Sequence, residues 1–317
     1  MAFWTNNLKS FKAYLHRQTL PGFKGIPIAI VLKYLWKEIM RDDIVTRSNS
    51  MAYCFFLSIF PGLLVLLALL PYFPIEDMVI TFRKSYINML PLQMATYIDN
   101  IITEMTQTGR GGLLSISLIL ALVFASNGVL SMVKGFHKSY EMTYKKQNTF
   151  QQRWRALWLT LLLGVLFIGS LAIIIVGRPL LFKLLAFTGV SIENYHFFNF
   201  IRWLGVFVIY YISITITYTF GPAYKNKEKL FSPGATLATI LSVISSFGFA
   251  IYVENFSNYN QIYGSIGALI LILVWLQINS FIILLGYELN ASIAINRDIL
   301  AYEDSMQKLE AAKQAAS

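Results

Sequence analysis

Apolar residues in this chain fall into long continuous stretches rather than into the short alternating runs typical of strands. The clearest stretch covers residues 264–287, which are 24 residues without a formal charge, followed by Glu288. A helix needs about 20 apolar residues, at a rise of about 1.5 Å each, to cross a bilayer. Residues 264–287 therefore predict a membrane-spanning helix.

Five further stretches have the same character, and they lie at about residues 50–73, 112–133, 156–177, 198–220 and 233–253. The composition agrees with this pattern: 56% of the residues are hydrophobic, 13% are charged, and the mean hydropathy is +0.57. An ordinary soluble domain is about 25% charged. The sequence thus predicts an all-α integral membrane protein with six transmembrane helices.

Basic residues are distributed unequally between the two sides that six spans create. Segments 1–49, 134–155, 221–232 and 293–317 fall on one side and hold 20 of the 26 Lys and Arg residues. Short cytoplasmic loops of membrane proteins carry such an excess, so both termini are predicted to be cytoplasmic. We therefore divide the chain into a cytoplasmic segment 1–49, a membrane domain 50–292 and a polar tail 293–317.

The segment before the first span has the pattern of an amphipathic helix. Apolar and basic positions each recur at helical spacing, the apolar ones being Ile28, Leu32, Leu35 and Ile39 and the basic ones Lys33, Lys37 and Arg41. Such a helix suits the surface of the cytoplasmic leaflet. A soluble helix that packs on the protein's own loops is the alternative.

The formal net charge of +10 would also suit nucleic acid. In a membrane protein, however, basic loops more commonly contact anionic lipid head groups. We expect this contact from the amphipathic segment and from the loop at 134–155, through Lys134, Lys138, Lys145 and Lys146. Membrane lipids are thus the expected partners, nucleic acid is not expected, and the pattern does not predict an oligomeric state.

Several signals are expected to interrupt the helices. Pro61 and Gly62 lie inside the first span, and a proline there predicts a kink or a break. Such a kink or break could be a binding position for a substrate or ion, or only a bend required by packing. Arg178 and Pro179 are expected to end the third span, which would leave 180–187 in the outer interface. Residues 74–111 are expected to form one or two short outer amphipathic helices, and 255–263 a loop.

A few polar residues lie within or at the ends of the spans, where they should face other helices or a wet cavity. The candidates for lining a path or bridging helices are Asn127, Ser213, Thr217, Gln277 and Asn279. Glu254, Glu288 and Asn290 lie near span ends. Each is a candidate gate or ion ligand, with an interfacial cap or a partner for Lys or Arg as the alternative.

The chain offers no recognisable catalytic constellation. His16, His137 and His196 are scattered, and Cys54 is the single cysteine. A zinc site needs clustered ligands, and neither a phosphate-binding P-loop nor a nucleophile elbow occurs. We therefore expect no metal, no cofactor and no enzymatic activity.

Two stretches carry distinctive patterns. Residues 41–70 contain A-Y-x-x-x-x-S-x-F-P-x-L-L, and residues 263–293 contain Y-G-S-x-G, an apolar run with Trp, and a G-x-E-L-N end. Together they resemble the YihY/BrkB family. This resemblance implies a bacterial inner-membrane protein with six spans and cytoplasmic ends. The family has been linked to virulence and, in some members, to envelope lipid export. Its old label of ribonuclease BN finds no support in these residues.

The resulting hypothesis is a transporter or flippase-like protein for an anionic or amphipathic cell-envelope compound. It is based on the basic inner face, the proline in the first span and the uncharged polar residues within the spans. The alternative is a scaffold that does not transport and that binds partners through its loops. An RNA-cleaving enzyme is the least favoured reading.

Overall fold

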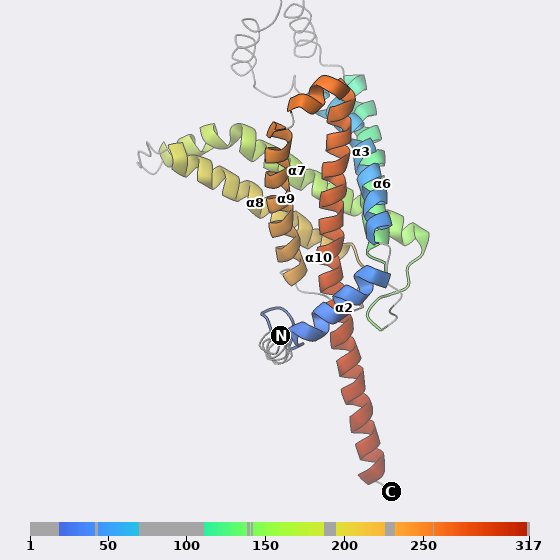
Figure 1. Ribbon diagram of the computed structural model, residues 1–317. Coiled ribbons are helices and arrows are strands. Elements are labelled where there is room, and N and C mark those ends of the chain that lie inside the picture. Colours follow the sequence, from blue (N-terminus) through green and yellow to red (C-terminus); the bar gives the residue numbers. More distant parts are fainter. Residues whose placement is uncertain are drawn as a thin grey trace, which may run out of the picture. The chain divides into compact units, whose positions relative to one another are not determined.

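The computed structural model of the chain describes residues 19–41, 44–69, 111–137, 140, 142–186, 195–225, 232–255 and 257–315. Within these residues the secondary structure is helical apart from one isolated bridge between two loops. The seven helices of the described part are α2 (Ile28–Arg41), α3 (Ile44–Leu69), α6 (Gly111–Gly135), α7 (Thr149–Ala186), α8 (Tyr195–Phe220), α9 (Pro233–Asn255) and α10 (Ser257–Ala315) (Figure 1). The predicted all-α class is confirmed.

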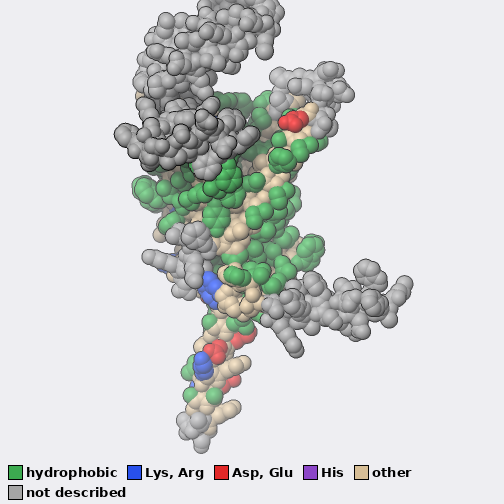
Figure 2. Space-filling model, turned by 90° about the vertical axis from the view of Figure 1, so that its left-hand side faces the viewer, with side chains coloured by type: hydrophobic (Ala, Val, Ile, Leu, Met, Phe, Trp, Pro, Cys, Tyr) green, Lys and Arg blue, Asp and Glu red, His purple; other side chains and the backbone are tan. Residues whose placement is uncertain are grey.

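Six of these helices are long and apolar enough to span a membrane, as the sequence predicts. The candidate spans are Ile44–Val65, Leu118–Gly135, Thr149–Ile174, Phe200–Phe220, Pro233–Glu254 and Leu269–Gln314. Their surfaces are largely apolar, and Figure 2 shows hydrophobic side chains over the visible face of the helices, whereas charged ones gather on the projecting end of α10. Such apolar surface is favourable against lipid and costly against water.

The chain divides into two compact units, residues 1–53 with 129–317, and residues 54–128. In the first unit, α7 packs against α8, α8 against α9, and α9 against α10, while α2 lies across α10 (Figure 1). In the second unit, the described parts of α3 and α6 meet where the ring of Phe55 covers Gly128.

Helix α7 continues past the point where the sequence predicts its end. It runs for 38 residues to Ala186, through Arg178 and Pro179, so the prediction that this pair ends the helix is wrong. A proline inside a helix costs about 3 kcal/mol. The candidate span ends at Ile174, before this pair, and the helix nevertheless continues.

Helix α10 is also longer than expected, with 59 residues from Ser257 to Ala315. The predicted loop at 255–263 is therefore helical from Ser257 onward, and the polar tail continues the same helix. The tail positions that are described, from Leu300 to Gln314, are exposed. Residues such as Ala, Glu, Lys and Gln have high helix propensity, so the tail stays helical without burying a face.

Pro61 does not break α3, which is continuous from Ile44 to Leu69. Pro61 is buried and Gly62 is partly exposed. The expectation of an interruption at this point is therefore wrong, while a bend stays a prediction. The outer segment predicted at 74–111 lies, except for Gly111, outside the described residues.

Helix α2 packs on the protein through most of its predicted apolar stripe. Leu35 is buried in a core cluster with Val31 and with Leu289 and Ile293 of α10, and Ile28 and Ile39 pack against that cluster. Leu32, by contrast, is exposed, although it belongs to the same predicted stripe. The helix carries two adjacent apolar stripes, and spacing alone does not show which one packs on the protein.

Candidate functional site

One end of the first unit carries the loops between α6 and α7 and between α8 and α9, together with α2. We call it the basic end, because the predicted lipid-contacting lysines lie there. The described ones are exposed on the surface, namely Lys33, Lys37, Lys134, Lys145 and Lys146. Lys138 and the side chain of Arg41 lie outside the described part. This end therefore presents a positively charged surface.

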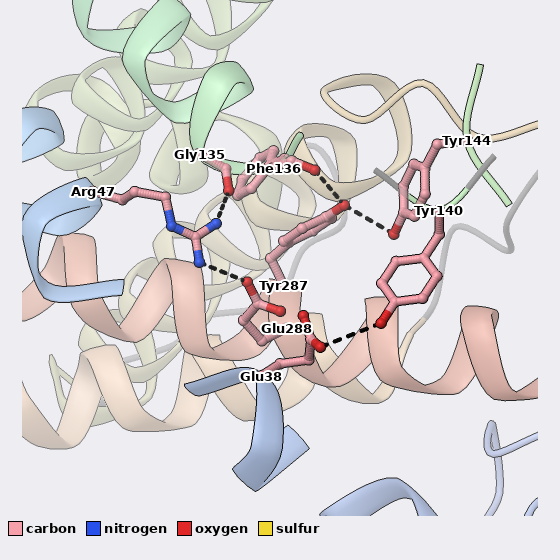
Figure 3. A network of polar contacts seen from close by, with 8 residues as sticks. All are labelled: Glu38, Arg47, Gly135, Phe136, Tyr140, Tyr144, Tyr287 and Glu288. Carbon is pink, nitrogen blue, oxygen red and sulfur yellow. Dashed lines mark hydrogen bonds and ion pairs between the residues drawn. The ribbon is translucent and has the colours of Figure 1, made fainter. Parts of the chain in front are cut away.

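Beneath this surface, Arg47 of α3 forms an ion pair with Glu288 of α10. The Nη2 atom of Arg47 lies 3.1 Å from Oε1 of Glu288, and the two side chains are 22% and 1% exposed. Nη1 of Arg47 also donates a hydrogen bond to the carbonyl oxygen of Gly135, at 2.6 Å. One guanidinium thus joins the start of α3, the end of α6 and α10 (Figure 3).

Tyr287, the neighbour of Glu288, holds the loop that follows α6. Its hydroxyl donates to the carbonyl oxygen of Phe136 at 2.7 Å and lies 3.0 Å from the hydroxyl of Tyr144. Tyr287 and Phe136 are both fully buried, and their rings are 4.2 Å apart. Burial, followed by the neighbouring Tyr287, raises the pKa of Tyr144 well above its usual value, so this hydroxyl keeps its proton.

Helix α2 joins the same cluster through Glu38, which is 3% exposed. The hydroxyl of Tyr140 donates to Oε1 of Glu38 over 3.4 Å, a long hydrogen bond. The ring of Tyr140 also lies near that of Tyr34, with 6.1 Å between the centroids. We refer to Arg47, Glu288, Tyr287, Tyr144, Tyr140 and Glu38 as the polar cluster (Figure 3).

The two loops of the basic end are bonded to each other. The amide of Lys145 donates to the carbonyl of Ala223 at 2.8 Å, and the amide of Lys225 donates to the carbonyl of Thr143 at 2.9 Å. Arg155 of α7 donates to the carbonyl oxygen of Pro222 at 2.6 Å. These backbone groups are thereby satisfied without water, and the described parts of the two loops are held to each other.

Asn290 follows Glu288 by two residues in α10, and its side chain contacts the start of α9. Its Oδ1 accepts a hydrogen bond from the amide of Gly234 at 2.8 Å, and its Nδ2 donates to Oγ of Ser232 at 2.8 Å. Ser232 itself caps α9, because its Oγ accepts from the amide of Ala235 at 3.3 Å. Asn290 therefore supplies a second cap from the neighbouring helix.

Replacing Asn290 with alanine is expected to destabilise the protein by about 1–2 kcal/mol, since the amide of Gly234 and the hydroxyl of Ser232 lose their partner. Asn290→Asp should stay close to the unmodified protein, because a carboxylate accepts both bonds and suits a helix N-terminus. Thermal unfolding in detergent would measure both variants. Equal unfolding temperatures for the two would contradict the cap.

The other predicted polar residues are found in several environments. Thr217 and Asn279 are buried and Ser213 is partly exposed. Each of the three donates to its own helix, namely to the carbonyl oxygens of Ser213, Trp275 and Ile209 respectively, at 2.8–2.9 Å. Their hydrogen bonds thus satisfy the side chains locally. Their role as path-lining residues stays a prediction.

Three predicted residues are not members of the polar cluster. Gln277 is partly exposed within α10, and Glu254 is exposed near the far end of α9. Asn127 is exposed and belongs to the second unit. The structure thus brings Glu288 and Asn290, out of the sequence-based candidates, to the basic end of the first unit.

Sequence reasoning missed Arg47, Tyr287 and Glu38. A signal for Arg47 existed, because a Glu at the end of one span commonly pairs with a basic residue at the same end of another span. Glu38 lies three residues after Leu35 and seven after Val31, so it shares their buried face. Nothing in the local pattern indicated that Tyr287 would contact residues about 150 positions away.

The polar cluster holds two carboxylates, but it lacks the composition of a metal centre. Among the described residues, no three His, Cys, Asp or Glu side chains come together in a way that could hold a metal ion. The chemistry that the cluster offers is the making and breaking of ionic and hydrogen-bonded contacts. Such contacts can hold helix ends together in one state and release them in another.

Comparison with known proteins gives a consistent result. Residues 35–313 match the model of the family described as virulence factor BrkB. YfkH of Bacillus subtilis strain 168, whose name describes it as ribonuclease-like, is 30% identical over 261 residues, covering 82% of this chain and 94% of that protein. The UPF0761 membrane protein VP0125 of Vibrio parahaemolyticus is 28% identical over 268 residues, covering 82% and 81%. No solved structure matches the chain.

Proposed function

Because the chain belongs to the virulence factor BrkB family and is a multi-pass bacterial membrane protein, we propose that it transports an anionic or amphipathic compound of the cell envelope across the membrane. In this proposal the polar cluster is a gate at the basic end, and the structure represents the state in which that gate is closed. The ion pair between Arg47 and Glu288 is the observation that carries the proposal.

An ion pair of this kind is hard to explain by stability alone. Removing two charges from water costs several kcal/mol for each ion, and apolar residues of similar volume are often as stabilising or more so. Ionisable residues within spans are therefore functional candidates by default. A gate has a use for the pair, because water that enters on opening hydrates both ions and offsets the cost of separating them.

The charge of the basic end suits the proposed substrate class. The exposed lysines of the basic end produce a positive potential that attracts anions toward it. In this proposal an anionic head group attracted by the lysines passes next to Arg47, which is 22% exposed. This end is predicted to face the cytoplasm, which is consistent with export of a compound that is made inside the cell.

Transport of a labelled anionic lipid by purified protein tests the proposal. The full-length protein is reconstituted in liposomes that contain a trace of phosphatidylglycerol with a fluorescent head group in both leaflets, and an impermeant reductant is added outside. Transport is expected to bleach the inner leaflet as well, whereas protein-free liposomes lose only the outer signal. Protein that neither binds nor moves the labelled lipid, with the zwitterionic analogue as a second probe, would contradict the proposal.

A non-transporting scaffold is the second candidate, and the end of α10 favours it. The described positions from Leu300 to Gln314 are all exposed and include the apolar side chains of Tyr302, Met306 and Leu309. In a scaffold, this projecting helix would bind a partner protein. Absence of lipid movement in the liposomes, together with loss of function in cells on truncation after Arg297, would favour the scaffold over the transporter.

A further inference from the structure

The surface of α2 that faces away from the protein has an unusual composition. Leu32, Trp36 and Met40 are 47%, 64% and 67% exposed. They are four residues apart along the helix, so they form one stripe. Three large apolar side chains would not be left in water at this spacing without a partner, since each loses about 1.5–3 kcal/mol relative to burial.

A second stripe of α2, next to the first, is basic. Lys33 and Lys37 are exposed, and each follows a member of the apolar stripe by one position. The circumference of α2 is thus divided into three parts, which are a buried face toward α10, an apolar stripe and a basic stripe. Helices that lie in the membrane interface have the last two in this arrangement.

The position of α2 brings both stripes to the level of the lipid head groups. Its core contacts on α10 are Leu289 and Ile293, just beyond the apolar stretch 264–287. Two residues separate its end, Arg41, from the start of the first candidate span at Ile44. In Figure 1, α2 lies across α10 rather than along it. A helix that crosses a spanning helix at this depth runs along the membrane surface.

We propose that α2 is a lipid-binding strap, in which Leu32, Trp36 and Met40 enter the boundary of the acyl chains and Lys33 and Lys37 bind the head groups of anionic phospholipids. Trp is favoured at this depth because its ring is apolar and its N–H is polar. The lysines favour anionic lipid, whose head group has a net negative charge, over zwitterionic lipid, whose phosphate is balanced by its own cation. This inference does not depend on whether the protein transports anything.

A fluorescent label on the apolar stripe tests the depth of α2. The full-length Cys54→Ser protein carries Trp36→Cys with an environment-sensitive label, in nanodiscs with and without phosphatidylglycerol. We expect quenching by lipids brominated on the acyl chain and protection from aqueous iodide. Met306→Cys on the exposed end of α10 is the matched control, and it should be open to iodide in every lipid mixture.

A second variant tests the lysines. At a low fraction of brominated lipid, phosphatidylglycerol should quench the Trp36→Cys label more strongly than phosphatidylcholine does. The double variant Lys33→Gln, Lys37→Gln should lose this preference, which should fall roughly fivefold for each lysine removed. If the double variant prefers phosphatidylglycerol as strongly as the protein with both lysines, the head-group contact is wrong. A label open to iodide would overturn the strap. Protection from iodide without quenching by brominated lipid would also overturn it, since a second copy of the chain would then cover the stripe.

Discussion

Replacing Gly234 or Gly286 with valine is expected to destabilise the protein by about 3 kcal/mol or more, because neither position has room for a side chain. A Cβ atom on Gly286 would lie 2.6 Å from the carbonyl oxygen of Gly234 and 2.7 Å from the Cβ atom of Ala238. A Cβ atom on Gly234 would overlap the carbonyl oxygen of Gly286. Backbone atoms have no rotamers with which to move aside, so α9 and α10 would have to separate.

Gly248 provides a control on α9 itself. A Cβ atom at this position meets no atom within 4 Å. Gly248→Val should therefore unfold at the same temperature as the unmodified protein or slightly above it, because valine has a higher helix propensity than glycine. Thermal unfolding in detergent would compare the three variants. If Gly234→Val and Gly248→Val unfold together, the close contact of α9 with α10 is wrong.

The ion pair between Arg47 and Glu288 is expected to respond unequally to the loss of either partner. Arg47→Ala leaves the carboxylate of Glu288, which is 1% exposed, without its ion-pair partner, and should cost about 3–5 kcal/mol. Glu288→Gln should cost less, because Arg47 is 22% exposed and its guanidinium can still reach water. Replacing both residues with methionine should restore the stability of the unmodified protein.

Chemical unfolding in detergent or lipid would measure this series, with the Lys308→Ala variant as the control. Lys308 pairs with Asp304 on the exposed end of α10, at 2.7 Å with side-chain exposures of 75% and 63%. Exposed pairs of this kind contribute little, so Lys308→Ala should be nearly neutral. A similarly small effect of Arg47→Ala would show that the pair beneath the basic end is hydrated rather than buried.

The spans could be predicted because membrane burial is a property of local composition. A stretch such as 264–287 carries its own evidence, and the six candidate spans follow from length and apolarity alone. Helix ends within or near the membrane were less predictable. Pro179 and the polar residues of 255–263 are strong end signals, yet α7 continues through Pro179 and α10 begins at Ser257.

The polar cluster depends on contacts that no local pattern contains. Arg47 and Glu288 are separated by 241 positions in the chain. The sequence predicts that Glu288 lies at a span end and that a basic partner is one of its options, but not which residue it meets. Likewise, the spacing in α2 shows two apolar stripes, and only the packing of Val31 on α10 shows that Leu32 faces outward.

In the proposed mechanism the ion pair opens during transport, and lipid movement by the variant with Arg47→Met and Glu288→Met is the decisive measurement. Two methionines suit the closed state as well as the ion pair does, but opening would expose their apolar surface to water at about 25 cal/mol for each Å². We expect this variant to unfold at the same temperature as the unmodified protein and to move labelled phosphatidylglycerol at least about tenfold more slowly, a difference of about 1.4 kcal/mol in the barrier. Equal rates of lipid movement in two equally stable proteins would contradict it.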